Sequence, residues 1–442
     1  MGEQQAKLRL GNFTDHFDQS ARTAVDERET VSGWSVGMVL FGICLTLPTL
    51  YTGAYTVDQL GFLGTVQAVF LASLVLALMS IPAAIVGSET KLSSYLIIEF
   101  VFGRRGSDFV NALLGLTLLG WFAVTAGFFG ETLAIACIGF FGSAPPVWLL
   151  TLISSLLIIL TTLFGFRAID KLALFAVPVL ILFLLYVSGL SVTDSNWETL
   201  LYSEASNPAY FTTAVSTVIG SLIVGVVLMP DLSRYARTRR DCVSASILGN
   251  GLGNLFSMLM GVMPALVTGL LDPMAWMISL GLLGSAFIIL VFATWTTNSV
   301  NLYSTTLAVA IIRPHTAEWK LAVGCGVFGT VLAMLGITDF FIVFLEWLGV
   351  IVPPVAAIYL TDYFVLGQKD YSLSLRHKLP DYDWAALLSW FVGTLLSALA
   401  FVMDFTFSSI PSFDALLITV PVYLFCRKLL WPVELQRTRV YT

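Results

Sequence analysis

The chain has 442 residues, of which 57% are apolar and 11% are charged, and its formal net charge is −6. A typical soluble domain carries about 25% charged residues, so this chain has too little charge to cover a water-exposed globule. The composition excludes an ordinary soluble protein, gives no sign of a nucleic-acid partner, and predicts an all-α protein whose solvent is the lipid bilayer.

Residues 1–32 are polar and lack an early apolar core with a small-residue cleavage site, so we predict a mobile cytoplasmic N-terminal tail and no signal peptide. Apolar stretches of about 20 residues, enough to cross a bilayer as helix, then recur as far as Pro432. The predicted spans are 33–57, 62–87, 109–140, 146–166, 170–190, 209–230, 243–271, 275–312, 319–337, 339–361, 384–403 and 411–431. The seventh and eighth are longer than one crossing needs, which predicts tilt or extension beyond the bilayer. Residues 432–442 form a cytoplasmic C-terminal tail.

The Lys and Arg residues alternate with these spans. All 22 of them fall in the N-terminal tail or follow an even-numbered span. The alternate loops contain none; they lie around Asp58, Ser143, Asp194, Asp272, Thr338 and Asp404. Because positively charged loops stay on the cytoplasmic side, the pattern predicts about twelve spans in a bacterial inner membrane, with both termini inside.

Cysteine and histidine give no sign of a metal or redox centre. The five cysteines are scattered without a CxxC pair, so neither a disulfide nor a metal role is expected. The three histidines, His16, His315 and His377, fall in the tail or in cytoplasmic loops. A histidine proton relay inside the membrane is therefore excluded.

Two spans contain interruptions at comparable positions. In the first span, residues 46–49 read Thr-Leu-Pro-Thr, and the proline removes a helix hydrogen bond. In the sixth, Gly220, Ser221, Gly225 and Pro230 form a comparable pattern. A repeat of five spans enters the membrane from the opposite side in its second copy, and paired interrupted helices in inverted halves indicate a midplane site in a transporter. Ordinary kinking or close packing is the alternative for either span alone.

Several dispersed motifs also occur in a known order. They are Gly120-Trp121-Phe122, Gly220-Ser221, Asp231 with Arg234, Trp295-Thr296-Thr297-Asn298, Pro353-Pro354, Asp362-Tyr363, and 90–95 with Phe102-Gly103. Together they resemble the nucleobase:cation symporter-1 family, within it the cytosine permease branch, over nearly the whole chain.

The resemblance implies a leucine-transporter-type fold of twelve helices. Residues 33–190 are then the first five-helix repeat, 209–361 the second, inverted repeat, and 384–431 two further helices. It also implies sodium- or proton-driven uptake of a small heterocycle by alternating access. We expect sodium, with proton coupling as the alternative. The oligomeric state stays open.

A sodium site is implied at the first and eighth spans. Hard cations take oxygen ligands, and Thr296 and Thr297 are adjacent hydroxyls deep in the eighth span. In the family, two hydroxyls here join backbone carbonyls, which correspond to those of Gly42, Leu45 or Thr46, and Ala293. The cytosine permease has an Asn in place of Ala293. The alternative is that the threonines bond their own helix carbonyls.

A substrate site is implied around Trp121, because a planar heterocycle stacks on an indole by about 1–3 kcal/mol. Neutral amides such as Asn298 and Asn301 both donate and accept, which suits a heterocycle edge. The candidate substrate residues are Thr49, Trp121, Thr125, Ser221, Leu222, Asn298 and Asn301, with Ser221 placed at the expected break. Ordinary helix packing and helix bridging are the alternatives.

Two positions depart from the cytosine permease branch. That branch has a Gln where this chain has Leu118, and a Phe where it has Leu222. A site that lacks a needed polar partner discriminates strongly against the ligand, whose buried groups stay unpaired. We therefore predict a planar nitrogen heterocycle that is not best satisfied by cytosine.

Two carboxylates, Glu131 and Glu346, are expected inside the membrane, where a charge costs about 2.5–3.5 kcal/mol on insertion scales. Each can serve either proton coupling or a structural hydrogen bond. Asp231 and Arg234 begin a basic loop that is expected to anchor the chain at the headgroups.

Other functions remain as alternatives. A carrier of the same fold for an amino acid or an amine is one, although residues 47–49 offer little to hold a carboxylate. A membrane enzyme requires clustered catalytic side chains, and a receptor normally carries a soluble output domain. The sequence contains neither.

Overall fold

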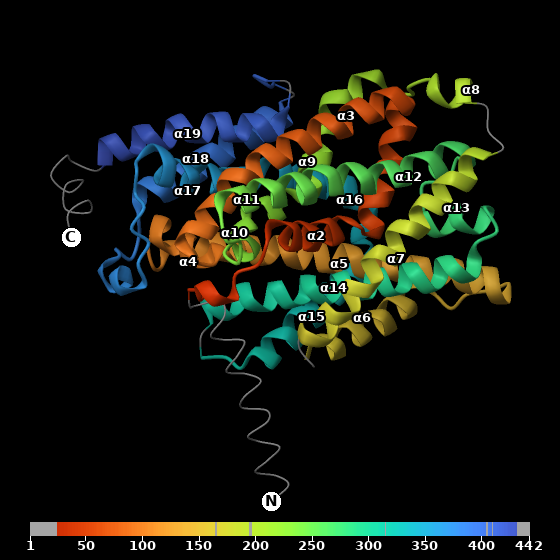
Figure 1. The fold of residues 1–442 in the computed structure, drawn as a ribbon, viewed down its shortest axis with the longest axis horizontal. Coiled ribbons are helices and arrows are strands. Elements are labelled where there is room, and N and C mark those ends of the chain that lie inside the picture. The colour runs from red at the N-terminus through yellow and green to blue at the C-terminus, as the bar shows by residue number, and fades with distance from the viewer. Residues whose placement is uncertain are drawn as a thin grey trace, which may run out of the picture.

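The computed structural model describes residues 24–163, 166–193, 197–313, 315–403, 405–408 and 410–430. The rest of the expected tails, residues 1–23 and 431–442, and the loop centres at Asp194 and Asp404 lie outside these ranges. Helices lie side by side along the long axis of the molecule (Figure 1). Within the described residues, the extended structure consists of a single bridge between Val31 and Ala236.

The helices occupy the following ranges in chain order. They are η1 (Glu27–Glu29), α2 (Gly33–Cys44), α3 (Leu47–Thr90), α4 (Ser94–Phe102), α5 (Gly106–Phe141), α6 (Val147–Leu163), α7 (Phe166–Thr193), α8 (Trp197–Leu201), η2 (Pro208–Tyr210), α9 (Phe211–Val227), α10 (Met229–Ser233), α11 (Arg239–Ser246), η3 (Ile247–Gly253), α12 (Asn254–Thr268), α13 (Pro273–Ser279), α14 (Leu283–Ile312), α15 (Glu318–Met334), η4 (Ile337–Phe340), α16 (Phe341–Ile351), α17 (Pro353–Leu360), η5 (Thr361–Val365), η6 (Leu373–Lys378), α18 (Trp384–Val402) and α19 (Pro411–Leu430).

Seven of the described helices are long and apolar enough to cross a membrane, and three shorter apolar helices accompany them. The longest, α3, has 44 residues. At 1.5 Å per residue it would be about 66 Å long, roughly twice the thickness of a hydrocarbon core. Gly61 divides it with a φ of 66°, and a Cβ there would lie 2.3 Å from the Ser203 carbonyl oxygen. Only glycine fits both the conformation and the close approach.

The interruption expected at residues 46–49 is present. Helix α2 ends at Cys44, Leu45 has a φ of −83° and a ψ of 74°, and Thr46 is extended. The Thr46 hydroxyl accepts from the Thr49 backbone N–H at 3.3 Å and so caps the start of α3. The proline at position 48 stands in the first turn, where its missing N–H costs nothing.

The break expected at Gly220 and Ser221 is absent, because α9 continues through both residues to Val227. A glycine costs a helix only about 1 kcal/mol, and here it serves packing: a Cβ on Gly220 would lie 1.9 Å from the Leu345 carbonyl oxygen on α16. The break comes later, at Leu228, just before Pro230 in α10.

The single long span expected at 275–312 is also wrong. It is divided into α13 and α14, with Gly281 between them at a φ of 77°. The Asp272 carboxylate caps α13 by accepting from the Ala275 N–H at 2.9 Å. The cap and the glycine supply the start and the stop that end a short helix.

The last part of the expected N-terminal tail is docked. Val31 donates its backbone N–H to the Tyr235 carbonyl at 2.7 Å, and the Gly33 N–H donates to the Asp241 carboxylate at 2.7 Å. Val25 donates to the Lys91 carbonyl at 3.1 Å. Residues 24–32 therefore pack beside the loop between α10 and α11, so the expected mobility does not extend to them.

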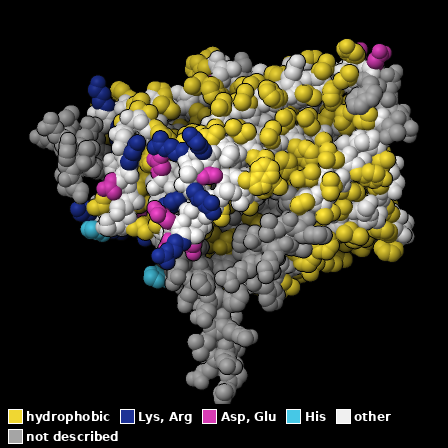
Figure 2. Space-filling view, in the orientation of Figure 1, with side chains coloured by type: hydrophobic (Ala, Val, Ile, Leu, Met, Phe, Trp, Pro, Cys, Tyr) yellow, Lys and Arg dark blue, Asp and Glu magenta, His cyan; other side chains and the backbone are white. Residues whose placement is uncertain are grey.

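Charge is unevenly distributed over the surface. In Figure 2, Lys and Arg side chains gather at the end of the molecule near α10 and α11, and hydrophobic side chains are spread over the opposite half of the described surface. Asp231 in α10 is partly buried and accepts from the Ser94 N–H at 2.8 Å, at the start of α4. Asp231 thus joins two helices as well as opening the basic loop.

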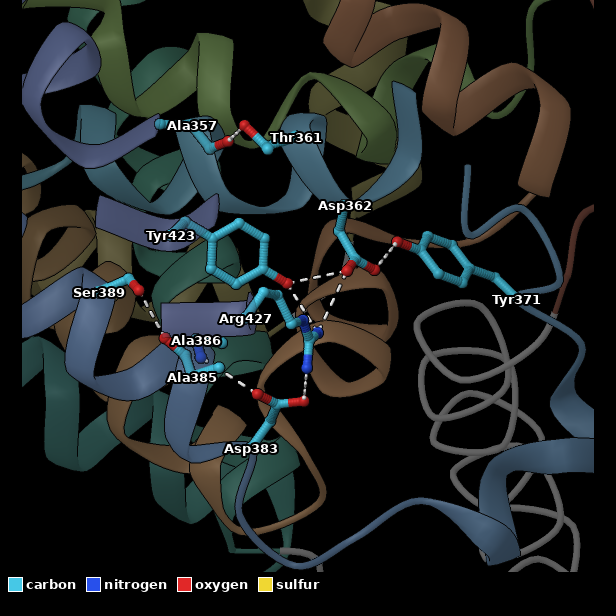
Figure 3. A network of polar contacts seen from close by, with 10 residues as sticks. All are labelled: Ala357, Thr361, Asp362, Tyr371, Asp383, Ala385, Ala386, Ser389, Tyr423 and Arg427. Atoms are coloured by element: carbon cyan, nitrogen blue, oxygen red, sulfur yellow. Dashed lines mark hydrogen bonds and ion pairs between the residues drawn. The ribbon is translucent and has the colours of Figure 1, made fainter. Parts of the chain in front are cut away.

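A buried ionic network holds α19 to the rest of the fold (Figure 3). The Arg427 guanidinium donates to Asp383 at 2.6 Å and to Asp362 at 3.2 Å. The hydroxyls of Tyr423 and Tyr371 donate to Asp362 at 2.8 Å and 3.1 Å. Because the side chains of Arg427, Asp362 and Asp383 are 7%, 2% and 1% exposed, the network fixes α19 against η5 and the start of α18.

Candidate substrate and cation site

Five aromatic residues from α3, α5 and α16 form one cluster, called the aromatic cluster below: Tyr51, Trp121, Phe128, Phe341 and Phe344. The ring centroid of Trp121 lies 6.1 Å from that of Phe341 and 5.7 Å from that of Phe344, in edge-on arrangements. Tyr51 lies 5.2 Å from Phe128 and 6.0 Å from Phe341. Edge-on pairs at these separations are favourable.

Trp121 is only partly buried in the middle of α5. It packs against the apolar cluster that contains Leu118, and Leu222 of α9 and Phe344 pack against the same cluster. Trp121, Leu118 and Leu222 therefore belong to or pack against one apolar cluster. Apolar surroundings of this kind suit the flat, apolar face of a ligand ring.

The polar side chains predicted for the site fall into two groups. Asn298 of α14 is fully buried and donates to the Phe122 carbonyl at 3.1 Å, so it bridges α14 and α5. Asn301 donates to the Asn298 side-chain oxygen at 3.4 Å and stays partly exposed. The Thr125 hydroxyl, one turn from Trp121, is buried without a hydrogen-bond partner. Asn298 is thus a helix bridge, whereas Thr125 has unused bonding capacity.

Two other predicted substrate residues already make internal bonds. The Ser221 hydroxyl donates to the Val218 carbonyl at 2.7 Å within α9, so it does not lie at a helix break as expected. The Thr49 and Thr46 hydroxyls lie 2.9 Å apart. These hydroxyls serve helix geometry first.

The two threonines predicted to hold sodium differ. Thr296 donates to the carbonyls of Phe292 at 2.9 Å and Ala293 at 3.0 Å, which is the back-bonded alternative. Thr297 is partly exposed, and the structure gives its hydroxyl no hydrogen bond to another described residue. Thr297 therefore has a free hydroxyl oxygen.

The backbone predicted to face the threonines lies at the α2–α3 break. The Gly42 carbonyl accepts from the Leu45 N–H at 3.1 Å, and the Thr46 carbonyl accepts from the Leu50 N–H at 3.1 Å. Among the described residues, no hydrogen bond reaches the Leu45 carbonyl. Leu45 belongs to the same apolar cluster as Ala293 of α14.

The two carboxylates expected inside the membrane differ. Glu131 on α5 accepts from the Thr338 hydroxyl of η4 at 2.7 Å. This bond joins two separate helices, which is the structural role considered from the sequence. Glu346 on α16 is partly buried. Within the described residues, no three His, Cys, Asp or Glu side chains are grouped as in a transition-metal site.

The comparison with known families decides the classification. Residues 24–420 match the family described as permease for cytosine/purines, uracil, thiamine, allantoin. The chain belongs to this permease family. The permease is a transporter and not an enzyme, so the membrane-enzyme alternative is set aside.

Curated relatives cover most of the permease. The cytosine permease of Escherichia coli strain K12 is 28% identical over 356 residues, which is 80% of this chain and 83% of that protein. The hydantoin permease of Microbacterium maritypicum is 25% identical over 339 residues, 67% of each chain.

Solved structures share the fold. Mhp1 in an inward-facing conformation has a TM-score of 0.80 at 18% identity, with 95% of this chain and 97% of that chain covered. Mhp1, a nucleobase-cation-symport-1 family transporter, in a closed conformation with bromovinylhydantoin bound, has a TM-score of 0.79 at 19% identity, with 96% and 99% covered. The permease therefore has the membrane-helical fold of these transporters.

Residues that the sequence analysis missed complete the aromatic cluster. Phe341 and Phe344 are three positions apart on α16, and Tyr51 lies five residues beyond Thr46. The only available signal was the position of Tyr51 just after an interrupted segment. Phe341 and Phe344 look like ordinary apolar residues until α16 is placed against α5.

Proposed function

We propose that this permease takes up a nucleobase or a related planar nitrogen heterocycle by sodium-coupled alternating access. The observation that carries the proposal is Trp121, which stays partly exposed in the aromatic cluster and packs against the same large apolar cluster as Leu118 and Leu222, in a chain of the permease family. One indole face and two aliphatic side chains suit a flat ring. Since Leu118 supplies no amide, cytosine is not the best ligand.

Sodium coupling is supported by oxygen atoms that the fold leaves available. The Thr297 hydroxyl and the Leu45 carbonyl make no hydrogen bond to other described residues, and Leu45 belongs to the same apolar cluster as Ala293, which lies one turn before Thr297 on α14. Oxygen ligands in dry surroundings suit a hard cation. Thr296, Ala293, Gly42 and Thr46 would complete the set.

We further propose twelve spans with both termini in the cytoplasm of a bacterial inner membrane. They are α2 with α3 as far as Gly61, the remainder of α3, α5, α6, α7, α9 with α10, 239–268, α14, α15, 337–365, α18 and α19. The one-sided distribution of the 22 basic residues supports this orientation. The interruptions at Leu45 and Leu228 support inverted repeats over 33–190 and 209–361.

The first experiment is a thermal-shift screen of the purified permease with cytosine, uracil, adenine, hydantoin, allantoin and L-leucine, in sodium or potassium chloride. We expect a heterocycle other than cytosine to raise the melting temperature most, and more in sodium. Proteoliposome uptake of that ligand should follow an imposed sodium gradient. Uptake driven by a proton gradient without sodium would reject sodium coupling and direct attention to Glu131 and Glu346. A shift with L-leucine alone would reject the heterocycle.

Trp121→Ala should weaken binding of the best heterocycle roughly 10- to 100-fold, because a base-aromatic stack is worth about 1–3 kcal/mol. Trp384→Ala is the control, since Trp384 is 61% exposed at the start of α18. Binding by isothermal titration checks both. Equal affinity in wild type and Trp121→Ala would remove the basis for the proposal.

A further inference from the structure

Few polar atoms around Trp121 are left to recognise a ring edge. The hydroxyl of Ser221 and the amide nitrogen of Asn298 hold internal bonds, and the Thr49 hydroxyl pairs with that of Thr46. A heterocycle buried there needs a partner for its edge groups, because an unpaired buried polar group costs about 1–3 kcal/mol. The Thr125 hydroxyl has no hydrogen-bond partner among the described residues, so that hydroxyl and the aromatic cluster remain to supply the partner.

Tyr51 is the one member of the aromatic cluster with a polar atom besides the Trp121 indole N–H. Its ring packs on Phe128 and on Phe341, and Phe341 also contacts Trp121. Phe341 thus contacts both the tyrosine and the tryptophan. The Thr46 cap fixes the start of α3 and so fixes where Tyr51, in its first turns, is placed.

The hydroxyl of Tyr51 is unused. The structure gives it no hydrogen bond to another described residue, and the side chain is only partly buried. A tyrosine in a mostly apolar site usually finds a partner for its hydroxyl. A phenol both donates and accepts, so it can pair with a ring carbonyl or with a ring nitrogen.

We propose that Tyr51 is a specificity-determining residue whose hydroxyl hydrogen-bonds the polar edge of a neutral heterocycle held beside Trp121. This inference rests on the proposed function and assigns the ligand's edge to a residue that shares the contact with Phe341. It accounts for edge recognition in a site where position 118 is a leucine. Ligands with a carbonyl or amide edge are expected to bind better than matched rings that lack it.

The chain offers a matched control in Tyr55, one turn further along α3. Its ring packs edge-on against that of Tyr210, with 6.0 Å between the ring centroids. Among the described residues, it makes no ring contact with Trp121 or Phe341. Like Tyr51, it is only partly buried. Tyr51→Phe and Tyr55→Phe therefore remove the same atom from two positions on one helix face while keeping both rings.

The experiment measures affinity ratios for ring pairs of one shape: uracil with cytosine, hypoxanthine with adenine, and hydantoin with 2-imidazolidinone. A ratio does not depend on the fraction of folded protein, so a partly unfolded variant still gives an answer. We expect Tyr51→Phe to bind the tightest wild-type ligand about tenfold more weakly and to shift the ratio within its pair by a similar factor. Tyr55→Phe should match wild type.

Three results would overturn the inference, and they can be told apart. If wild type binds one of these rings and Tyr51→Phe keeps both its affinity and its ratio, Tyr51 does not read the edge and the proposed function stands. If wild type binds none of the six rings, the proposed function itself fails and the role of Tyr51 fails with it. Equal losses in Tyr51→Phe and Tyr55→Phe would also reject a specific role.

Discussion

Neighbouring residues on one helix differ in what they can offer a ligand. The Thr296 hydroxyl donates to the carbonyls of its own helix, whereas the Thr297 hydroxyl makes no such bond. A threonine that turns back onto its helix keeps lone pairs but has lost some freedom to reorient. The free hydroxyl of Thr297 is therefore the more informative atom to remove.

Thr297→Ala should weaken sodium binding roughly tenfold or more, since interactions with a charged group are worth about 1.5–3 kcal/mol. Because linked ligands affect each other equally, heterocycle affinity at fixed sodium should fall as well. Titration of sodium against the thermal shift checks both effects.

Thr305→Ala is the control for this measurement. Thr305 lies on the same helix, is 1% exposed and donates to the Asn301 carbonyl at 2.8 Å. It should leave the sodium dependence unchanged. A sodium titration of Thr297→Ala that overlays that of wild type would argue against a ligand role.

At the scale of elements, the contact between α9 and α16 depends on one missing side chain. Gly220→Ala places a Cβ 1.9 Å from the Leu345 carbonyl oxygen, so the helices must separate. Overpacking of this kind costs about 1–3 kcal/mol or more. We expect a lower melting temperature and reduced uptake, because Leu222 lies two residues further along α9.

Gly225→Ala tests the same substitution without the clash, since nothing lies within 4 Å of a Cβ at Gly225. An alanine there should leave the melting temperature equal or raise it, because alanine favours a helix over glycine by roughly 0.5–1 kcal/mol. Similar losses in both variants would show that glycine, and not the close approach, is what α9 requires.

The ionic network around Arg427 supports a second prediction at this scale. Arg427→Met leaves Asp362 and Asp383 buried without their cation, and breaking such a pair typically costs about 3–5 kcal/mol. The melting temperature in detergent should fall clearly. Adding Asp383→Asn to the Arg427→Met variant should recover part of the loss, because it removes one of the two unpaired buried charges.

Arg104→Met provides the comparison. Arg104 pairs with Asp381 at 2.7 Å, but the two side chains are 48% and 41% exposed. Exposed pairs contribute about 0–1 kcal/mol, so a small change is expected. Equal effects of Arg104→Met and Arg427→Met would mean that burial does not set the strength of the Arg427 network.

At the scale of the whole molecule, charge sets the orientation in the membrane. Ser143 and Ser374 are both exposed, Ser143 after the end of α5 and Ser374 in η6, and the proposed topology places them on opposite sides. In a background without the five native cysteines, Ser143→Cys should react with an impermeant maleimide from outside intact cells, and Ser374→Cys only after permeabilisation. The reverse pattern would invert the proposed topology.

The sequence alone determined the class of molecule and the coarse course of the chain. Low charge and long apolar stretches require a lipid solvent, and dispersed motifs such as Gly120-Trp121-Phe122 were sufficient for the family. The break at Leu45 was also predictable, because Pro48 and the Thr46 cap act through neighbouring residues alone.

Only the tertiary structure decided which signals were local and which served packing. Gly220 looks like a helix break in sequence, yet its role is set by the Leu345 carbonyl of a helix about 120 residues away. Tyr51 and Phe341 likewise become neighbours of Trp121 only when α3, α5 and α16 are assembled. Sequence patterns report the preferences of a residue within its own helix, whereas the partner of a side chain is set by which helix packs against it.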